Sequence, residues 1–84
     1  MKKIEIVPLA LKKIGRRKVT QQWVEETVNH PDQVVGGYGG RKVRQKKYIV
    51  NGKEMLLRVV VHEEKERLVV ITAYLTSQIK RYWR

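Results

Sequence analysis

The pair Asn51-Gly52 separates two runs of residues that have the composition of β-strands. Val43 to Val50 precedes the pair and Glu54 to His62 follows it, and both runs contain branched residues that suit a pleated surface. Asn and Gly both accept the positive φ angles that a tight hairpin turn requires. The sequence therefore predicts an antiparallel hairpin over residues 43–62.

The second run of this hairpin has two different faces. One face is wholly apolar and is expected to meet the helices; its residues are Met55, Leu57, Val59 and Val61. The opposite face carries Arg58 between Leu56 and Val60. This arrangement predicts a charged side chain in an otherwise apolar part of the sheet.

The turn leaves two strand registers open, and they differ in which face the basic side chains join. A two-residue loop pairs Val50 with Lys53, and a three-residue loop pairs Val50 with Glu54. The first register turns Arg44, Lys46 and Tyr48 toward the apolar face, and the second places them beside Arg58. We expect the second register, because cations facing the helices are costly to bury.

Helical patterns dominate the first third of the chain. Apolar residues at helical spacing predict a helix that starts at Pro8 and ends near Gly15, followed by a basic connector over residues 16–18. A second helix is expected after Thr20, which can cap it, and before Pro31, which stops it.

Further strands complete the predicted sheet. Residues 4–6 alternate as a short strand, and Arg67 to Leu75 forms the most apolar strand, which we expect to be central. Ile79, Tyr82 and Trp83 share one face of a short helical turn at the C-terminus. The predicted fold is a single α+β domain, residues 1–84, with N-terminal helices packed on a three- to four-stranded antiparallel sheet.

Charge is the strongest indication of function. Nineteen Lys and Arg residues stand against eight Asp and Glu residues, which gives a net charge of +11. Such an excess favours a polyanion, and nucleic acid is the leading partner. The chain has no apolar run long enough to span a membrane, no readable signal peptide and no cysteine. We expect a cytoplasmic protein without a metal or other cofactor.

The densest basic cluster follows a glycine-rich connector at residues 36–40. Basic residues interleaved with an aromatic side chain suit RNA backbone contacts and base stacking, and the cluster consists of Arg41, Lys42, Arg44, Lys46, Lys47 and Tyr48. A solvated edge strand, kept from aggregating by its lysines, explains the same pattern equally well. Lys80, near the C-terminus, is a further candidate for RNA binding.

Two short segments and the order of elements resemble a known group of proteins. The segments are Leu57-Arg58-Val59-Val60-Val61 and Leu68-Val69-Val70-Ile71-Thr72-Ala73, and a basic, aromatic tail follows them. This order is similar to that of the RelE/ParE/BrnT group of small toxins from prokaryotic toxin–antitoxin pairs. It looks closest to a family of short basic prokaryotic proteins that end in a V-V-x-T-A-Y strand and an R-Y-W tail.

The resemblance implies a RelE-like fold and a ribonuclease that cuts messenger RNA, often on the ribosome, and that a cognate antitoxin protein silences. Its strand arginine falls on Arg58 and its C-terminal tyrosine on or near Tyr82. A second arginine of the group would fall near Ser77, where this chain has no cation, and Lys80 and Arg81 are the nearest substitutes.

Metal-free RNA cleavage is chemically reasonable with these side chains, because the 2′-hydroxyl of RNA can attack the adjacent phosphate. An arginine such as Arg58 or Arg81 stabilises the phosphate oxygens, and Tyr74 or Tyr82 can orient or exchange a proton. The leading hypothesis is an endoribonuclease. The alternatives are an RNA-binding domain without catalysis and an interaction protein whose basic face docks an acidic partner.

Overall fold

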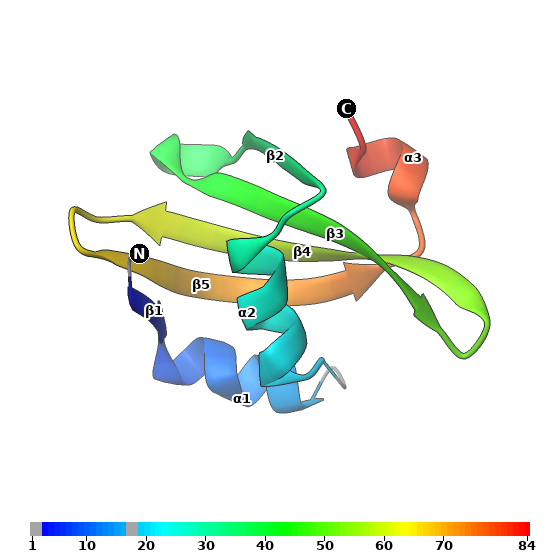
Figure 1. The fold of residues 1–84 in the computed structure, drawn as a ribbon, viewed down its shortest axis with the longest axis horizontal. Coiled ribbons are helices and arrows are strands. Elements are labelled where there is room, and N and C mark those ends of the chain that lie inside the picture. Colours follow the sequence, from blue (N-terminus) through cyan, green and yellow to red (C-terminus); the bar gives the residue numbers. More distant parts are fainter. Residues whose placement is uncertain (1–2, 17–18) are drawn as a thin grey trace.

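The computed structural model describes residues 3–16 and 19–84 and shows an α+β fold, drawn in Figure 1. In this part of the chain three helices accompany one five-stranded mixed sheet with the order β1-β5-β4-β3-β2. The helices are α1 (Pro8–Arg16), α2 (Gln21–Asn29) and α3 (Ile79–Tyr82). The strands are β1 (Lys3–Ile6), β2 (Gln33–Gly36), β3 (Lys42–Val50), β4 (Lys53–Glu63) and β5 (Arg67–Thr76).

The sheet is larger than predicted, and one of its pairings is parallel. β1 pairs parallel with β5, and β2 pairs antiparallel with β3. The strand over Arg67 to Leu75 was expected to be central, but β4 is central and β5 lies between β4 and the edge strand β1. Because β1 pairs with its outer edge, β5 is an interior strand, and its apolar sequence fits that position. β2 was not predicted, because a four-residue strand that runs into the glycine-rich connector has too little alternation to be recognised.

The hairpin of β3 and β4 has the two-residue turn. Val50 pairs with Lys53, so the predicted pairing of Val50 with Glu54 is wrong. Asn51 and Gly52 have φ angles of 52° and 77°, which match the left-handed conformations that such a turn needs. Arg44, Lys46 and Tyr48 consequently lie on the same face as Met55, and this face is covered by α2.

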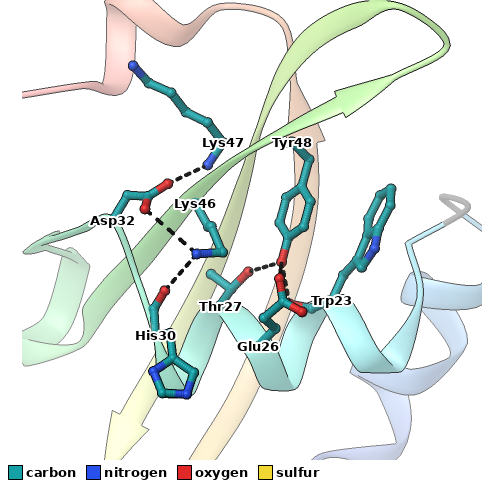
Figure 2. Close-up of polar contacts among 8 residues, drawn as sticks. All are labelled: Trp23, Glu26, Thr27, His30, Asp32, Lys46, Lys47 and Tyr48. Carbon is teal, nitrogen blue, oxygen red and sulfur yellow. Dashed lines mark hydrogen bonds and ion pairs between the residues drawn. The ribbon is translucent and has the colours of Figure 1, made fainter.

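The backbone of α2 explains why cations tolerate this face. The last carbonyls of a helix have no partner within the helix, and the helix dipole makes this end negative. Arg44 Nη1 donates to the Val28 carbonyl, and Lys46 Nζ donates to the His30 carbonyl at 3.0 Å (Figure 2). The burial cost that argued against this register is therefore offset by charge-assisted hydrogen bonds.

Both long helices cover one face of the sheet, as expected. The hydroxyl of Thr20 caps α2 by accepting a 3.0 Å hydrogen bond from the Trp23 N–H group. Helix α1 ends at Arg16, and residues 17–18 of the predicted basic connector lie outside the described residues. The core joins Ile14, Val19, Val24 and Val28 from this layer to the predicted apolar face of β4. None of the helices in the described segments is long and apolar enough to cross a membrane.

Candidate nucleic-acid interface

Arg58 lies at the centre of the sheet face that α1 and α2 leave uncovered. It projects from the middle of the central strand β4, where the buried Leu56 and the half-buried Val60 flank it on the same face. Arg58 is itself half-buried. A guanidinium in such surroundings is less screened by water than a surface arginine, so its attraction for an anion is stronger.

The guanidinium of Arg58 is held by three side chains from three different elements. Its Nε donates to Gln45 Oε1 of β3 at 2.7 Å, and its Nη1 donates to the Tyr74 hydroxyl of β5. The Tyr82 ring of α3 stacks on the guanidinium, whose central carbon lies 4.0 Å from the ring centroid. These contacts fix the position of the charge and leave one guanidinium nitrogen, Nη2, outside the two hydrogen bonds.

Arg81 brings a second guanidinium to the same place. Its central carbon lies 5.4 Å from the Tyr82 ring centroid, and its Nη1 donates to Gln78 Oε1 at 3.3 Å. Arg81 is exposed, so its charge is available to a ligand. Arg58, Tyr74, Tyr82 and Arg81, the four residues predicted to take part in catalysis, thus form one cluster.

Gln45 organises this cluster and was not predicted. It is fully buried, at 0% exposure, and besides accepting from Arg58 it donates to Gln33 Oε1 at 3.1 Å and to the Tyr82 carbonyl at 3.3 Å. The expected register placed Gln45 on the other face, away from Arg58. In the observed register Gln45 is directly opposite Arg58. A glutamine in that position can accept a hydrogen bond from the arginine, so the correct register would have identified Gln45 as a partner of Arg58.

The C-terminal tail is fastened across the sheet by a second glutamine. Gln33 of β2 donates to the Arg84 carbonyl at 2.7 Å and accepts from the Arg84 N–H group at 2.9 Å. Together with the bond from Gln45 to the Tyr82 carbonyl, these contacts hold the backbone on both sides of Trp83. We call Gln33 and Gln45 the glutamine clamp.

The predicted RNA-binding cluster of β3 divides between the two faces of the sheet. Arg44, Lys46 and Tyr48 face α2, where each donates a hydrogen bond to a protein acceptor, while the buried Nε of Arg44 has no partner. Figure 2 shows Lys46 between the His30 carbonyl and Asp32, whose carboxylate lies 3.7 Å from Lys46 Nζ. This half of the cluster connects the sheet to the helix.

Tyr48 is a half-buried member of that half. Its ring stacks on Trp23 with centroids 4.6 Å apart, and its hydroxyl donates to Glu26 Oε1 at 2.9 Å (Figure 2). Burial raises the pKa of the Tyr48 hydroxyl, and the Glu26 carboxylate raises it further, although the hydrogen bond with Thr27 opposes the shift. Tyr48 is therefore placed to stabilise the fold rather than to stack on a base.

Lys47 belongs to the other face and joins the C-terminal tail. Its Nζ lies 4.2 Å from the centroid of the Trp83 ring, at a cation–π distance. Lys47, Trp83, Lys80 and Arg81 line a cleft of about 850 Å³ between the β3–β4 hairpin and α3. The cleft thus unites two predicted RNA-binding residues with one predicted catalytic residue.

Arg41 and Lys42 lie away from this cleft. Both are exposed near the start of β3, and Lys42 precedes Lys47 by five residues, or roughly 17 Å along a strand. They extend the basic surface beyond the cleft toward the start of β3.

Neither described histidine reaches Arg58. His62 is at the end of β4, roughly 13 Å along the strand from Arg58, and its Nε2 lies 4.0 Å from Glu64 Oε2. The His30 side chain is exposed beyond the end of α2. In residues 3–16 and 19–84 no group of three or more His, Asp or Glu side chains is arranged to hold a metal ion.

Comparison with known proteins gave one match, to a family model. No curated protein and no solved structure matched the chain significantly. The family model, described as Domain of unknown function (DUF4258), matches residues 10–75, more than three-quarters of the chain. The matched region includes Gln45, Arg58 and Tyr74 and ends before Tyr82. On the extent of this match, the chain belongs to the DUF4258 family.

Proposed function

We propose that this protein is an endoribonuclease that cleaves messenger RNA without a metal ion, as the resemblance to RelE-like toxins implies. One observation supports this proposal above all others. Arg58, Tyr74 and Tyr82 come from separate parts of the sequence and meet around the Arg58 guanidinium, and Arg81, the chain neighbour of Tyr82, contacts the same tyrosine ring. A cluster of two arginines and two tyrosines on one sheet face suits a phosphodiester better than a merely structural role.

The chemistry uses a nucleophile that RNA itself supplies. The 2′-oxygen attacks the adjacent phosphorus, the bond from phosphorus to the 5′-oxygen breaks, and the products are a 2′,3′-cyclic phosphate and a 5′-hydroxyl. The remaining Nη2 donors of Arg58 and the exposed guanidinium of Arg81 stabilise the phosphate oxygens as negative charge accumulates on them. The hydroxyls of Tyr74 and Tyr82 orient the phosphate.

The proton balance predicts a distinctive pH dependence. The 2′-hydroxyl loses a proton to solvent hydroxide, and the 5′-oxygen gains one from water, because no described histidine is close to Arg58. A histidine base would make the rate level off above about pH 6.5. We expect the rate instead to continue rising from about pH 6 to pH 9, since hydroxide supplies the base.

RNA binding without cleavage is the second candidate, and the same contacts favour it. Two guanidinium nitrogens of Arg58 already have protein acceptors, and the Tyr82 ring covers the guanidinium face. In this alternative Arg58 mainly supports the tail, and Arg81, Lys47 and Lys80 bind phosphates.

The proposal includes a cognate antitoxin protein as partner, which also follows from the resemblance. Co-expression with the product of an adjacent reading frame, followed by size-exclusion chromatography, tests for a stable complex.

Cell-free translation tests the cleavage reaction directly. The purified protein is added to the reaction, and the 5′ ends of the RNA are mapped with and without ribosomes. We expect discrete new 5′ ends that disappear with Arg58→Ala and persist with Lys12→Ala, which removes an exposed cation from α1. Circular dichroism establishes that Arg58→Ala is folded. Intact RNA under all conditions would refute cleavage and leave the binding alternative.

A further inference from the structure

The cleft beside the Arg58 cluster has the dimensions of a ligand site. Its volume of about 850 Å³ lies within the range of roughly 300–1,000 Å³ that is typical of small-molecule pockets. The hairpin of β3 and β4 forms one wall with Lys47 and Glu54, and residues 77–81 together with Trp83 form the other. Arg81 belongs both to this cleft and to the Arg58 cluster, so the two sites are adjacent.

The charge of the cleft suits a phosphate. Lys47, Lys80 and Arg81 contribute three cations, against a single carboxylate from Glu54. Within the described part of the chain, the ion pairs do not include any of these three cations. Their charges are therefore available to an anionic ligand.

The cleft also presents an aromatic ring in a fixed position. The glutamine clamp holds the Tyr82 carbonyl and both backbone groups of Arg84, so the backbone on either side of Trp83 is fastened. A ligand that stacks on this indole does not have to order the tail first, which reduces the entropic cost of binding. Lys47 already occupies the electron-rich face of the ring as a cation.

We propose that the cleft binds one unpaired nucleotide of the RNA, with its base stacked on Trp83 and its phosphate between Lys80 and Arg81. Lys47, on a flexible side chain, exchanges the indole face for the phosphate when the base stacks. A base exposes its face for stacking only when it is unpaired, so this site selects single-stranded RNA over a duplex. The inference rests on RNA being the ligand in the proposed function, but it does not require cleavage.

The experiment uses an RNA analogue that cannot be cleaved. Hexaadenylate with 2′-O-methyl groups keeps the base faces and the phosphates but lacks the attacking hydroxyl. The chain has two tryptophans, so in a Trp23→Phe background the fluorescence reports Trp83 alone. We expect the hexamer to quench this fluorescence, and a 2′-O-methyl duplex of equal length formed by the self-complementary sequence GCGCGC to quench it at least tenfold more weakly.

Variants at residue 83 separate stacking from charge, and their Kd is measured from the anisotropy of a fluorescein-labelled hexamer, because they lack the Trp83 fluorescence. Trp83→Leu keeps an apolar side chain without an aromatic face and should raise the Kd about 10-fold, or ~1.4 kcal/mol. Trp83→Phe should remain within about threefold of the parent, since a smaller ring still stacks. Lys12→Ala, on the far face of the sheet, controls for the loss of one positive charge from Lys80→Ala, which should weaken binding more.

The results distinguish failure of this inference from failure of the proposed function. Equal affinities of Trp83→Leu and Trp83→Phe, or equal binding of the duplex, would overturn the stacking site even if translation reactions show RNA cleavage. Quenching by the hexamer together with intact RNA in translation would refute cleavage and leave the site established. Absence of any quenching at low salt would overturn the site directly.

Discussion

Replacing Gln45 with methionine tests whether the glutamine clamp holds the interface together. Methionine is unbranched and similar in size to glutamine, so Gln45→Met leaves little cavity and removes mainly hydrogen bonds. The lost contacts are one bond from a charged donor, Arg58 Nε, and two neutral bonds, to Gln33 and to the Tyr82 carbonyl. The residue is fully buried, so water cannot replace these partners at the side chain itself.

The size of the effect follows from the types of bond. A hydrogen bond to a charged group is worth ~1.5–3 kcal/mol, and a neutral one ~0.5–1.5 kcal/mol. Arg58 is half-buried and regains some hydration, and Gln33 still accepts from Arg84. We therefore expect Gln45→Met to lower the free energy of unfolding by ~2–4 kcal/mol, which is a large part of the ~5–15 kcal/mol typical of small domains.

Urea denaturation and thermal unfolding measure this loss. A fall of ~2–4 kcal/mol corresponds to a decrease in Tm of roughly 10–30 °C for a domain of this size. Gln22→Met, at an exposed position of α2, is the matched control and should leave Tm nearly unchanged. A Tm for Gln45→Met within about 3 °C of the parent would refute the argument that these three bonds hold the tail on the sheet.

Four further predictions address the caps, charges and faces of the molecule. Thr20→Ala should destabilise the protein by ~1 kcal/mol in urea denaturation, because α2 loses its N-cap, whereas Thr20→Ser should have a smaller effect. The pKa of Tyr48 is raised in the folded state, so its contribution to stability is present below the unfolded pKa of 10.0 and is lost as pH rises through the folded pKa. Tyr48→Phe should therefore flatten the fall in the free energy of unfolding measured between about pH 9 and 11. Glu54→Gln removes the carboxylate of the cleft and should raise RNA affinity severalfold in a low-salt binding assay. Lys46→Ala should lower Tm and spare RNA affinity, while Lys47→Ala should spare Tm, weaken RNA binding and reduce the salt slope by about one.

Local signals in the sequence predicted most of the elements. The Asn51-Gly52 turn, the Thr20 cap and the helical turn near the C-terminus each depend on residues close together in the chain, and the structure contains all three. The parallel pairing of β1 with β5 joins residues more than sixty positions apart. Such a pairing follows from how the helices pack, which a local pattern does not encode.

The charged and aromatic residues of the candidate site could be named from the sequence, but the glutamine that holds them in place could not. Charged and aromatic side chains are candidates for binding or catalysis in any sequence, and the site contains four of them: Arg58, Tyr74, Tyr82 and Arg81. Gln45 is polar and uncharged, so its residue type alone does not mark it as functional. Its position opposite Arg58 reveals that it is the hydrogen-bond acceptor for the guanidinium. The wrong register removed that clue.

The register error shows how the same hairpin turn determines which basic residues are free to bind. Successive side chains of a strand point to opposite faces, so the pairing of Val50 with Lys53 sends Lys46 to the helix and Lys47 to the cleft. The burial cost of a lysine beneath a helix argued against this register. That cost is lower than expected because Lys46 donates to a carbonyl oxygen at the end of α2. The basic cluster of β3 is therefore two half-clusters, and the turn at Asn51 and Gly52 determines which half packs against the helix and which half remains exposed to a ligand.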